Sequence, residues 1–81
     1  MRIHVRLFAS QRESIGQSAI NADVPDGSTA ASALRALAAQ YPDLAAASES
    51  LAFAVNREHA APETPLNDGD ELALLPPVAG G

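Results

Sequence analysis

The sequence predicts an α+β fold, in which a mixed sheet of about five strands carries one main helix packed on one of its faces. Short segments with alternating apolar and polar residues stand near both ends of the chain, and this period of two is typical of half-buried strands. A longer segment between them spaces its apolar residues as a helix does. The chain has 81 residues, which is enough for one small domain that buries roughly 60% of its unfolded surface.

The first two predicted strands form a hairpin with a long loop. Apolar side chains alternate with polar ones over residues 3–7 and again over residues 20–24. Residues 9–16 connect the two strands, and we expect a short helical turn there that ends at Gly16.

The main helix is expected over residues 29–41. A Pro-Asp-Gly turn precedes it, Ser28 is the expected N-cap, and Pro42 ends it. The following segment, residues 43–50, is expected to be a loop or a short turn. The predicted apolar face of the helix comprises Ala30, Ala33, Leu34, Leu37 and Tyr41.

The second half of the chain supplies the remaining strands. Residues 51–55 alternate as a strand, and a tight Asn-Arg turn leads from them into a short strand over 58–60. Leu66 is a predicted core residue. The Asn-Asp-Gly-Asp sequence at 67–70 is a strong turn signal, and the last strand follows over 72–75.

This order of elements predicts a β-grasp, or ubiquitin-like, arrangement. A hairpin, a crossing helix and further strands suit a mixed sheet whose first and last strands are parallel and central. We therefore expect a β-grasp domain over residues 1–75, followed by a flexible tail over residues 76–81 that leaves the body just beyond the sheet.

The tail is the most informative part of the sequence. Its two prolines end the last strand and keep the exit extended, because proline has no N–H to donate and a fixed φ. The two glycines make the thinnest possible peptide, and six extended residues span roughly 20 Å. A frayed terminus is the alternative, but we favour a tail that threads its terminal carboxylate into a narrow channel of another protein. The tail consists of Pro76, Pro77, Val78, Ala79, Gly80 and Gly81.

Composition excludes several classes of function. The net charge of −5 argues against nucleic acid and against an anionic membrane surface. We see no apolar run long enough for a membrane span and no signal peptide, so we expect a cytoplasmic protein. The absence of cysteine removes disulfides and thiolate chemistry, and the absence of lysine means that the chain cannot form chains of itself through lysine side chains.

The body of the domain shows no active-site motif. Asp68, Asp70 and Glu71 surround a glycine, but the pattern of a calcium loop is missing, and we expect no metal site. His4 and His59 have no partner at ligand spacing and are predicted to be partly exposed strand residues. We find neither a serine triad nor a phosphate loop.

The remaining reactive group is the terminal carboxylate of Gly81. A carboxylate is a poor electrophile until it is activated, for example as an acyl-adenylate. Because the chain has no nucleotide-binding motif, another protein would have to bind the ATP. The activated carbonyl could then pass to an amine, a thiol or a sulfide.

A docking surface is predicted on the sheet near the tail. Phe8 has the strand parity of Arg6, opposite the core residues, and Leu75 lies opposite the core in the same sense. Together they would form an exposed apolar patch, which often marks a partner site. Arg6 and Arg12 could surround it and attract an acidic partner, or they could be ordinary solvated charges. The alternative is that a loop covers Phe8 or that a bulge turns it inward.

Over nearly its whole length the chain resembles the MoaD family, which belongs to the MoaD/ThiS ubiquitin-like superfamily. Its members are the small, sulfur-carrying subunits of molybdopterin synthase. The closing Pro-Pro-Val-Ala-Gly-Gly after a Gly-Asp-Glu strand is the most specific part, since a terminal diglycine alone is shared by all ubiquitin-like carriers. The resemblance is carried by Leu7-Phe8-Ala9 with Arg12-Glu13, by Ala54-Val55-Asn56, by residues 66–72 and by residues 76–81.

The resemblance implies a mechanism. An E1-like adenylyltransferase (MoeB-like) adenylates Gly81 with ATP and Mg²⁺, and a sulfurtransferase donor converts it to a thiocarboxylate. The carrier then docks on the large synthase subunit (MoaE-like), in a heterotetramer, and donates sulfur to cyclic pyranopterin monophosphate for molybdenum cofactor biosynthesis. It implies that the chain binds no cofactor and is not an enzyme in isolation. The family often has an aromatic residue where this chain has Leu75.

Two alternatives remain open from the sequence. One is a related sulfur carrier for thiazole or cysteine synthesis, against which the two prolines and Arg12-Glu13 argue. The other is a ubiquitin-like modifier that is conjugated through Gly81 to lysines of target proteins.

Overall fold

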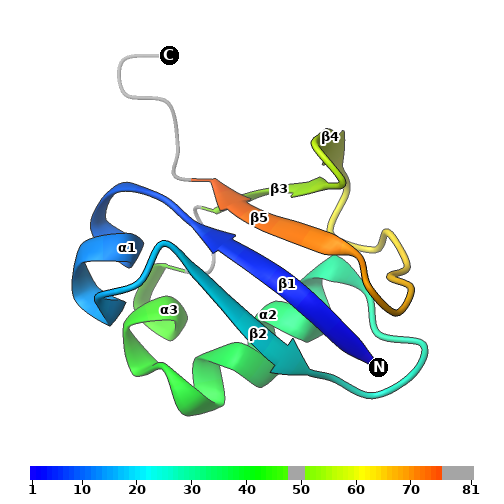
Figure 1. The fold of residues 1–81 in the computed structure, drawn as a ribbon, viewed down its shortest axis with the longest axis horizontal. Helices are drawn as coiled ribbons and strands as arrows, with labels where there is room; N and C mark the ends of the chain where they lie inside the picture. The colour runs from blue at the N-terminus through cyan, green and yellow to red at the C-terminus, as the bar shows by residue number, and fades with distance from the viewer. Residues whose placement is uncertain (48–50, 76–81) are drawn as a thin grey trace.

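The computed structural model describes residues 1–47 and 51–75 (Figure 1). The tail, residues 76–81, lies outside these residues. The elements in chain order are β1 (Arg2–Leu7), α1 (Ala9–Ile15), β2 (Ala19–Asp23), α2 (Ala30–Gln40), α3 (Pro42–Ala47), β3 (Ala52–Val55), β4 (Glu58–Ala60) and β5 (Glu71–Leu75).

The five strands form one mixed sheet in the order β2-β1-β5-β3-β4. β1 and β5 are parallel, whereas β2 is antiparallel to β1 and β3 is antiparallel to β5. α2 crosses behind the sheet in the view of Figure 1. This is a β-grasp fold, and the predicted parallel pairing of the first and last strands inside the sheet is confirmed.

The core lies between the sheet and α2. The predicted apolar face of α2 is confirmed: four of its residues are buried, and Tyr41 is half-buried. A fully buried leucine or valine contributes roughly 1.5–3 kcal/mol, so this layer is the main source of stability. The core comprises Ile3, Val5, Leu7, Ile20, Val24, Ala30, Ala33, Leu34, Leu37, Leu44, Leu51, Phe53, Leu66, Leu72 and Leu74.

The N-cap of α2 is Thr29, and the prediction of Ser28 was wrong by one residue. The Thr29 hydroxyl accepts the Ser32 N–H at 3.2 Å, while the Ser32 hydroxyl accepts the Thr29 N–H at 2.7 Å. Ser28 is used in the preceding turn instead, because its hydroxyl and its N–H both donate to the Pro25 carbonyl, at 2.6 and 3.1 Å.

α3 occupies a segment that we expected to be a loop or a short turn. Pro42 is its first residue, a position that suits proline because the N–H has no helical partner there. Leu44 is fully buried and anchors α3 in the core, against α1 and α2. The prediction failed because the apolar signal of this six-residue helix rests on a single leucine.

The predicted short turn before β2 is a seven-residue helix, α1. It ends as expected at Gly16, whose φ of +83° is the left-handed conformation that glycine adopts without a steric penalty. The Gly16 N–H donates to the Arg12 carbonyl at 2.9 Å. Within residues 1–47 and 51–75, no helix is long and apolar enough to span a membrane.

Candidate functional site: the open sheet face

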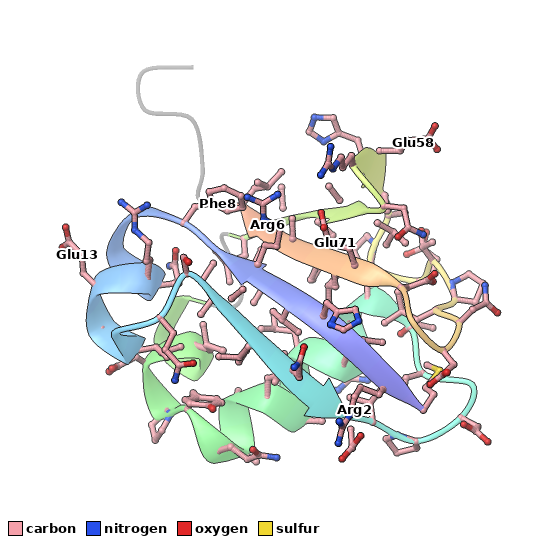
Figure 2. The ribbon with its side chains drawn as sticks, viewed as in Figure 1. Arg2, Arg6, Phe8, Glu13, Glu58 and Glu71 are labelled. Atoms are coloured by element: carbon pink, nitrogen blue, oxygen red, sulfur yellow. The ribbon has the colours of Figure 1, made fainter. Side chains whose placement is uncertain are left out.

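The face of the sheet that points away from α2 is called the open face here, and it lies toward the viewer in Figure 2. The strand registers define its members, since side chains alternate between the two faces. The open face consists of Arg2, His4 and Arg6 of β1, Ala19, Asn21 and Asp23 of β2, Ala52 and Ala54 of β3, His59 of β4, and Glu71, Ala73 and Leu75 of β5.

Phe8 extends this face by one residue beyond β1. It is the N-cap of α1, and its extended backbone (φ −134°, ψ 156°) continues the strand. Its ring lies 5.6 Å from the Arg6 guanidinium carbon, and it is half-buried but outside the core cluster, so a bulge does not turn it inward. Because Leu7 pairs with Leu74, the next residues, Phe8 and Leu75, leave neighbouring strands at the same end of the sheet.

Small side chains make a floor beside Phe8. Ala54 and Ala73 are each only 7% exposed and do not belong to the core cluster, since they face away from α2. Ala52 pairs with Leu75 at the end of this floor. We call these five residues, Phe8, Ala52, Ala54, Ala73 and Leu75, the apolar patch; the alternation had predicted its two large members.

Three charged residues lie beside the apolar patch. The Glu71 carboxylate is 3.9 Å from an Arg6 nitrogen and 4.0 Å from the Arg57 Nε. In Figure 2, Arg6 lies between Phe8 and Glu71. Arg57 and Glu71 were not among the predicted site residues, although Glu71 has the strand parity of Leu75 and could have been placed on this face from the sequence.

Arg12, the other predicted basic residue of the site, lies on α1, four residues after Phe8. Its side chain is exposed, and within the described part of the chain it joins none of the ion pairs. The structure therefore brings Arg6 into a charge network on the open face and leaves Arg12 on the neighbouring helix.

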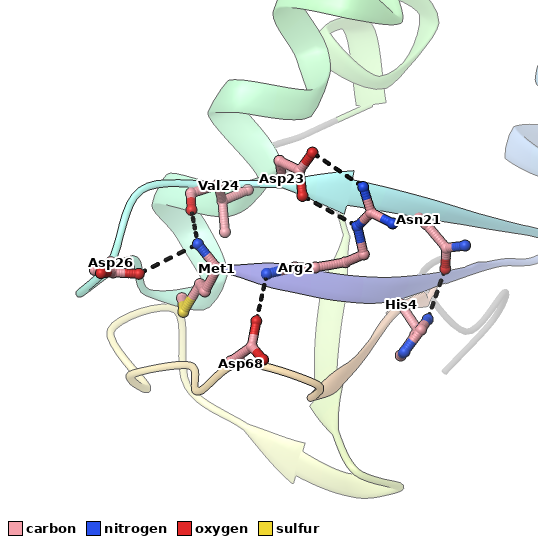
Figure 3. Close-up of polar contacts among 8 residues, drawn as sticks. All are labelled: Met1, Arg2, His4, Asn21, Asp23, Val24, Asp26 and Asp68. Carbon is pink, nitrogen blue, oxygen red and sulfur yellow. Dashed lines mark hydrogen bonds and ion pairs between the residues drawn. The ribbon is translucent and has the colours of Figure 1, made fainter.

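Polar bonds occupy the opposite end of the open face (Figure 3). Arg2 donates through Nε and Nη2 to both carboxylate oxygens of Asp23, at 3.1 and 3.3 Å, and its backbone N–H donates to Asp68 at 2.7 Å. His4 Nδ1 lies 2.6 Å from the Asn21 side-chain oxygen. The polar side chains at this end are therefore paired with one another, which distinguishes it from the end that carries Phe8 and Leu75.

The paired carboxylate predicts a pH dependence. The hydrogen bonds from Arg2 lower the pKa of Asp23 below its ordinary value of 3.8. A lowered folded pKa means that the contribution is complete above the unfolded pKa and is lost as the pH falls through the folded pKa. We therefore expect the Tm advantage of the wild type over Asp23→Asn at neutral pH to be small, since the pair is exposed, and to shrink below about pH 4.

Thermal melts of both proteins across the acid range, at low salt, measure this difference. Glu63→Gln, a change at another exposed carboxylate, is the control and should show no such closing gap. A gap between the wild type and Asp23→Asn that stays constant from neutral pH into the acid range would contradict the prediction.

At the edge of the sheet, a hollow of about 360 Å³ lies at the β3–β4 hairpin and the segment before β5. Asn56 and Asp70 line it, but they are bonded to each other at 3.0 Å and to backbone N–H groups. We assign the hollow no ligand. Within the described ranges, no three His, Asp or Glu side chains stand close enough to bind a metal.

The predicted tail residues, from Pro76 to Gly81, lie outside the described residues. The last described residue, Leu75, belongs to the apolar patch, so the tail starts at the edge of this patch.

A scan against protein families matches residues 5–81 to the model described as the ThiS family. A molybdopterin synthase sulfur carrier subunit from Chlamydomonas reinhardtii is 35% identical over an alignment of 83 positions, which covers 100% of both chains. The Escherichia coli protein of the same name is 41% identical, and the match covers 98% of this chain and 99% of that protein. Small archaeal modifier protein 3 of Haloferax volcanii is 36% identical, with 100% of both chains covered.

Solved structures agree with this fold. The crystal structure of SAMP1 from Haloferax volcanii matches with a TM-score of 0.83 at 33% identity, and the match covers 100% of both chains. A chain in a protein–protein complex of subunits 1 and 2 of molybdopterin-converting factor from Helicobacter pylori matches with a TM-score of 0.69 at 32% identity, again over 100% of both chains.

Proposed function

The chain belongs to the ThiS family, and on this basis we propose that it is the sulfur carrier subunit of a molybdopterin synthase, with Gly81 as the carrier residue. The observation that carries the proposal is the family match through Gly81, together with full-length relatives named as molybdopterin synthase sulfur carrier subunits. The position of the apolar patch, at the end of β5 from which the tail starts, supports a tail that is delivered to a docked partner.

The proposed chemistry takes place on the backbone terminus. An oxygen of the Gly81 carboxylate attacks the α-phosphorus of ATP on an E1-like enzyme, and pyrophosphate leaves. A hydrosulfide ion then attacks the carbonyl of the acyl-adenylate, AMP leaves with the electrons of the broken C–O bond, and the resulting thioacid loses its proton to give the thiocarboxylate. The chain itself needs no cysteine for this, and ATP and Mg²⁺ are bound by the activating partner.

The proposed partner of the open face is the large synthase subunit. The match to a chain in a complex of molybdopterin-converting factor subunits supports this choice. The apolar patch would supply the buried centre of the interface, because aromatic and aliphatic side chains in such centres carry most of the binding energy. We propose a heterotetramer with a small subunit at each end of a large-subunit dimer, acting in the cytoplasm, in which this chain donates sulfur to cyclic pyranopterin monophosphate and catalyses no step alone.

A second candidate is a protein modifier that is conjugated through Gly81. The likeness to small archaeal modifier proteins favours it, since these match at similar identity over the full length. A carrier for thiazole or cysteine synthesis would use the same activated terminus with a different acceptor.

The intact mass of the protein tests the proposal. After incubation with ATP, Mg²⁺, the E1-like enzyme of the same organism and a sulfur source, we expect a gain equal to the replacement of one oxygen by sulfur, located at Gly81. Addition of the large subunit and the pterin substrate should then remove the sulfur, so that the mass of the protein returns to its original value. No gain with an enzyme that adenylates Gly81, together with lysine-linked adducts on other proteins, would support the modifier instead.

A further inference from the structure

Arg57 occupies an unusual backbone position. β3 and β4 are joined by two residues, Asn56 and Arg57, with φ of +51° and +71°. Two positive φ values are the mark of a type I′ hairpin, in which glycine is strongly preferred at the second position. Asparagine tolerates the left-handed region, whereas a long side chain such as arginine is uncommon there. A residue that is found at a backbone position unfavourable to it indicates a functional role for its side chain.

The hairpin is tied firmly to the start of β5. The Asn56 N–H donates to the Glu71 carbonyl at 2.8 Å, and the Glu71 N–H donates to the Asn56 side-chain oxygen at 3.0 Å. The Asn56 amide also donates to Asp70 at 3.0 Å. These bonds fix the backbone of Arg57 beside Glu71. The Arg57 side chain is therefore anchored at a defined position at the edge of the open face.

Arg57 and Arg6 approach the same carboxylate. On a chain whose net charge is −5, the Glu71 carboxylate lies 3.9 Å from an Arg6 nitrogen and 4.0 Å from the Arg57 Nε. Arg2 is paired instead with Asp23, at the other end of β1. Two guanidinium groups therefore share one carboxylate next to Ala73 of the apolar patch.

The Arg57 guanidinium remains available for a partner. Its side chain is 81% exposed, and its nearest approach to Glu71 is 4.0 Å, which is an ion pair in water and of little energetic value. Glu71, at 27% exposure, is held between Arg6 and Arg57 and cannot neutralise both. A carboxylate from a docked protein would complete this set, and its attraction would strengthen as the interface excludes water.

We propose that Arg57 is a partner-binding residue at the edge of the open face, where its backbone is fixed by the hairpin and its guanidinium pairs with a carboxylate of the large subunit. This inference rests on the proposed docking of that subunit. It assigns to the interface a charged contact at the β3–β4 hairpin, in addition to the apolar patch, whose large members Phe8 and Leu75 lie toward the other end of β5.

Arg57→Gly is the most direct test, because stability and affinity should respond differently. Glycine relieves the left-handed backbone, so the Tm of the free protein should stay the same or rise. The Kd for the large subunit of the same organism, measured by calorimetry, should increase about 3- to 10-fold at about 50 mM salt, and the difference should narrow to within about twofold near 0.5 M salt. Arg57→Asn, which also tolerates positive φ, should behave like Arg57→Gly, and Arg57→Lys should retain most of the affinity.

Two further variants separate the possible failures. Arg35→Ala removes an exposed arginine from α2, on the other side of the sheet, and should leave the Kd unchanged. Phe8→Asp tests the docking face itself. If Phe8→Asp weakens binding and Arg57→Gly binds like the wild type at low salt, the role of Arg57 is overturned and the proposed docking stands. If neither variant weakens binding, the open face is not the docking surface and both proposals fail.

Discussion

A protein extended by one alanine after Gly81 should show no gain of sulfur and no synthase activity, although it folds normally. The added residue moves the terminal carboxylate and converts the Gly81 carbonyl into an ordinary amide, which an adenylating enzyme cannot activate. Gly81 is the sixth residue after Leu75, the end of β5, so we expect the Tm to be unchanged. Intact-mass measurement after incubation with ATP and the activating enzyme, together with a thermal melt, checks both parts.

The control for this variant is Ala79→Ser, which changes the tail but keeps Gly81 as the free terminus. It should gain sulfur like the wild type. If the extended protein gains sulfur at the wild-type rate and keeps the extra alanine, Gly81 is not the residue that carries the sulfur.

Replacing Phe8 with aspartate should strongly weaken binding to the large subunit without unfolding the free protein. Phe8 is half-buried on the open face, so docking would bury the rest of its ring in the centre of the interface. Loss of such an aromatic residue typically costs about 2–4 kcal/mol of binding free energy, which corresponds to roughly 30- to 700-fold in Kd.

Stability should hold because Phe8 is the N-cap of α1 and makes no side-chain cap there. Aspartate is among the preferred N-cap residues, so it can compensate for the lost contacts of the ring. Calorimetric titration with the large subunit and thermal melts of the free variant measure the two effects.

Two variants serve as controls for the Phe8 substitution. Phe8→Leu keeps an apolar side chain and should retain much of the affinity, while Gln40→Asp adds the same charge at the exposed end of α2 and should retain all of it. A large fall in Tm for Phe8→Asp would mean that the ring stabilises the core, and unchanged binding would mean that the large subunit docks elsewhere.

Most of the fold followed from local sequence patterns. The period of two over β1 and β5, and the helical spacing from Ala30 to Leu37, predicted both the sheet and the face of α2 that packs on it. The errors were local. Ser28 and Thr29 are both good N-cap residues, and only the turn, which uses the Ser28 hydroxyl on Pro25, decides between them. α3 was missed because its one buried leucine acquires its partners from α1 and α2.

The candidate site divides in the same way. The alternation placed Phe8, Arg6 and Leu75 on the open face, since parity along a strand is a local property. Arg57 and Glu71 are 14 positions apart, and nothing local to either predicts that they meet. The same holds for Ala54 and Ala73, whose pairing across β3 and β5 makes the floor of the apolar patch.

Local patterns were enough to predict the five strands, the main helix and the β-grasp arrangement, because strand alternation, helical spacing and turn signals act over a few residues. The resemblance to the MoaD/ThiS superfamily over nearly the whole chain was also present in the sequence, and the family match over residues 5–81 confirmed it. Which residues of different strands become neighbours on the open face, and which charges meet there, depends on the strand pairing. The pairing of β1 with β5, and of β3 with β5, joins residues tens of positions apart, and such contacts follow from burial of the whole core rather than from any local preference.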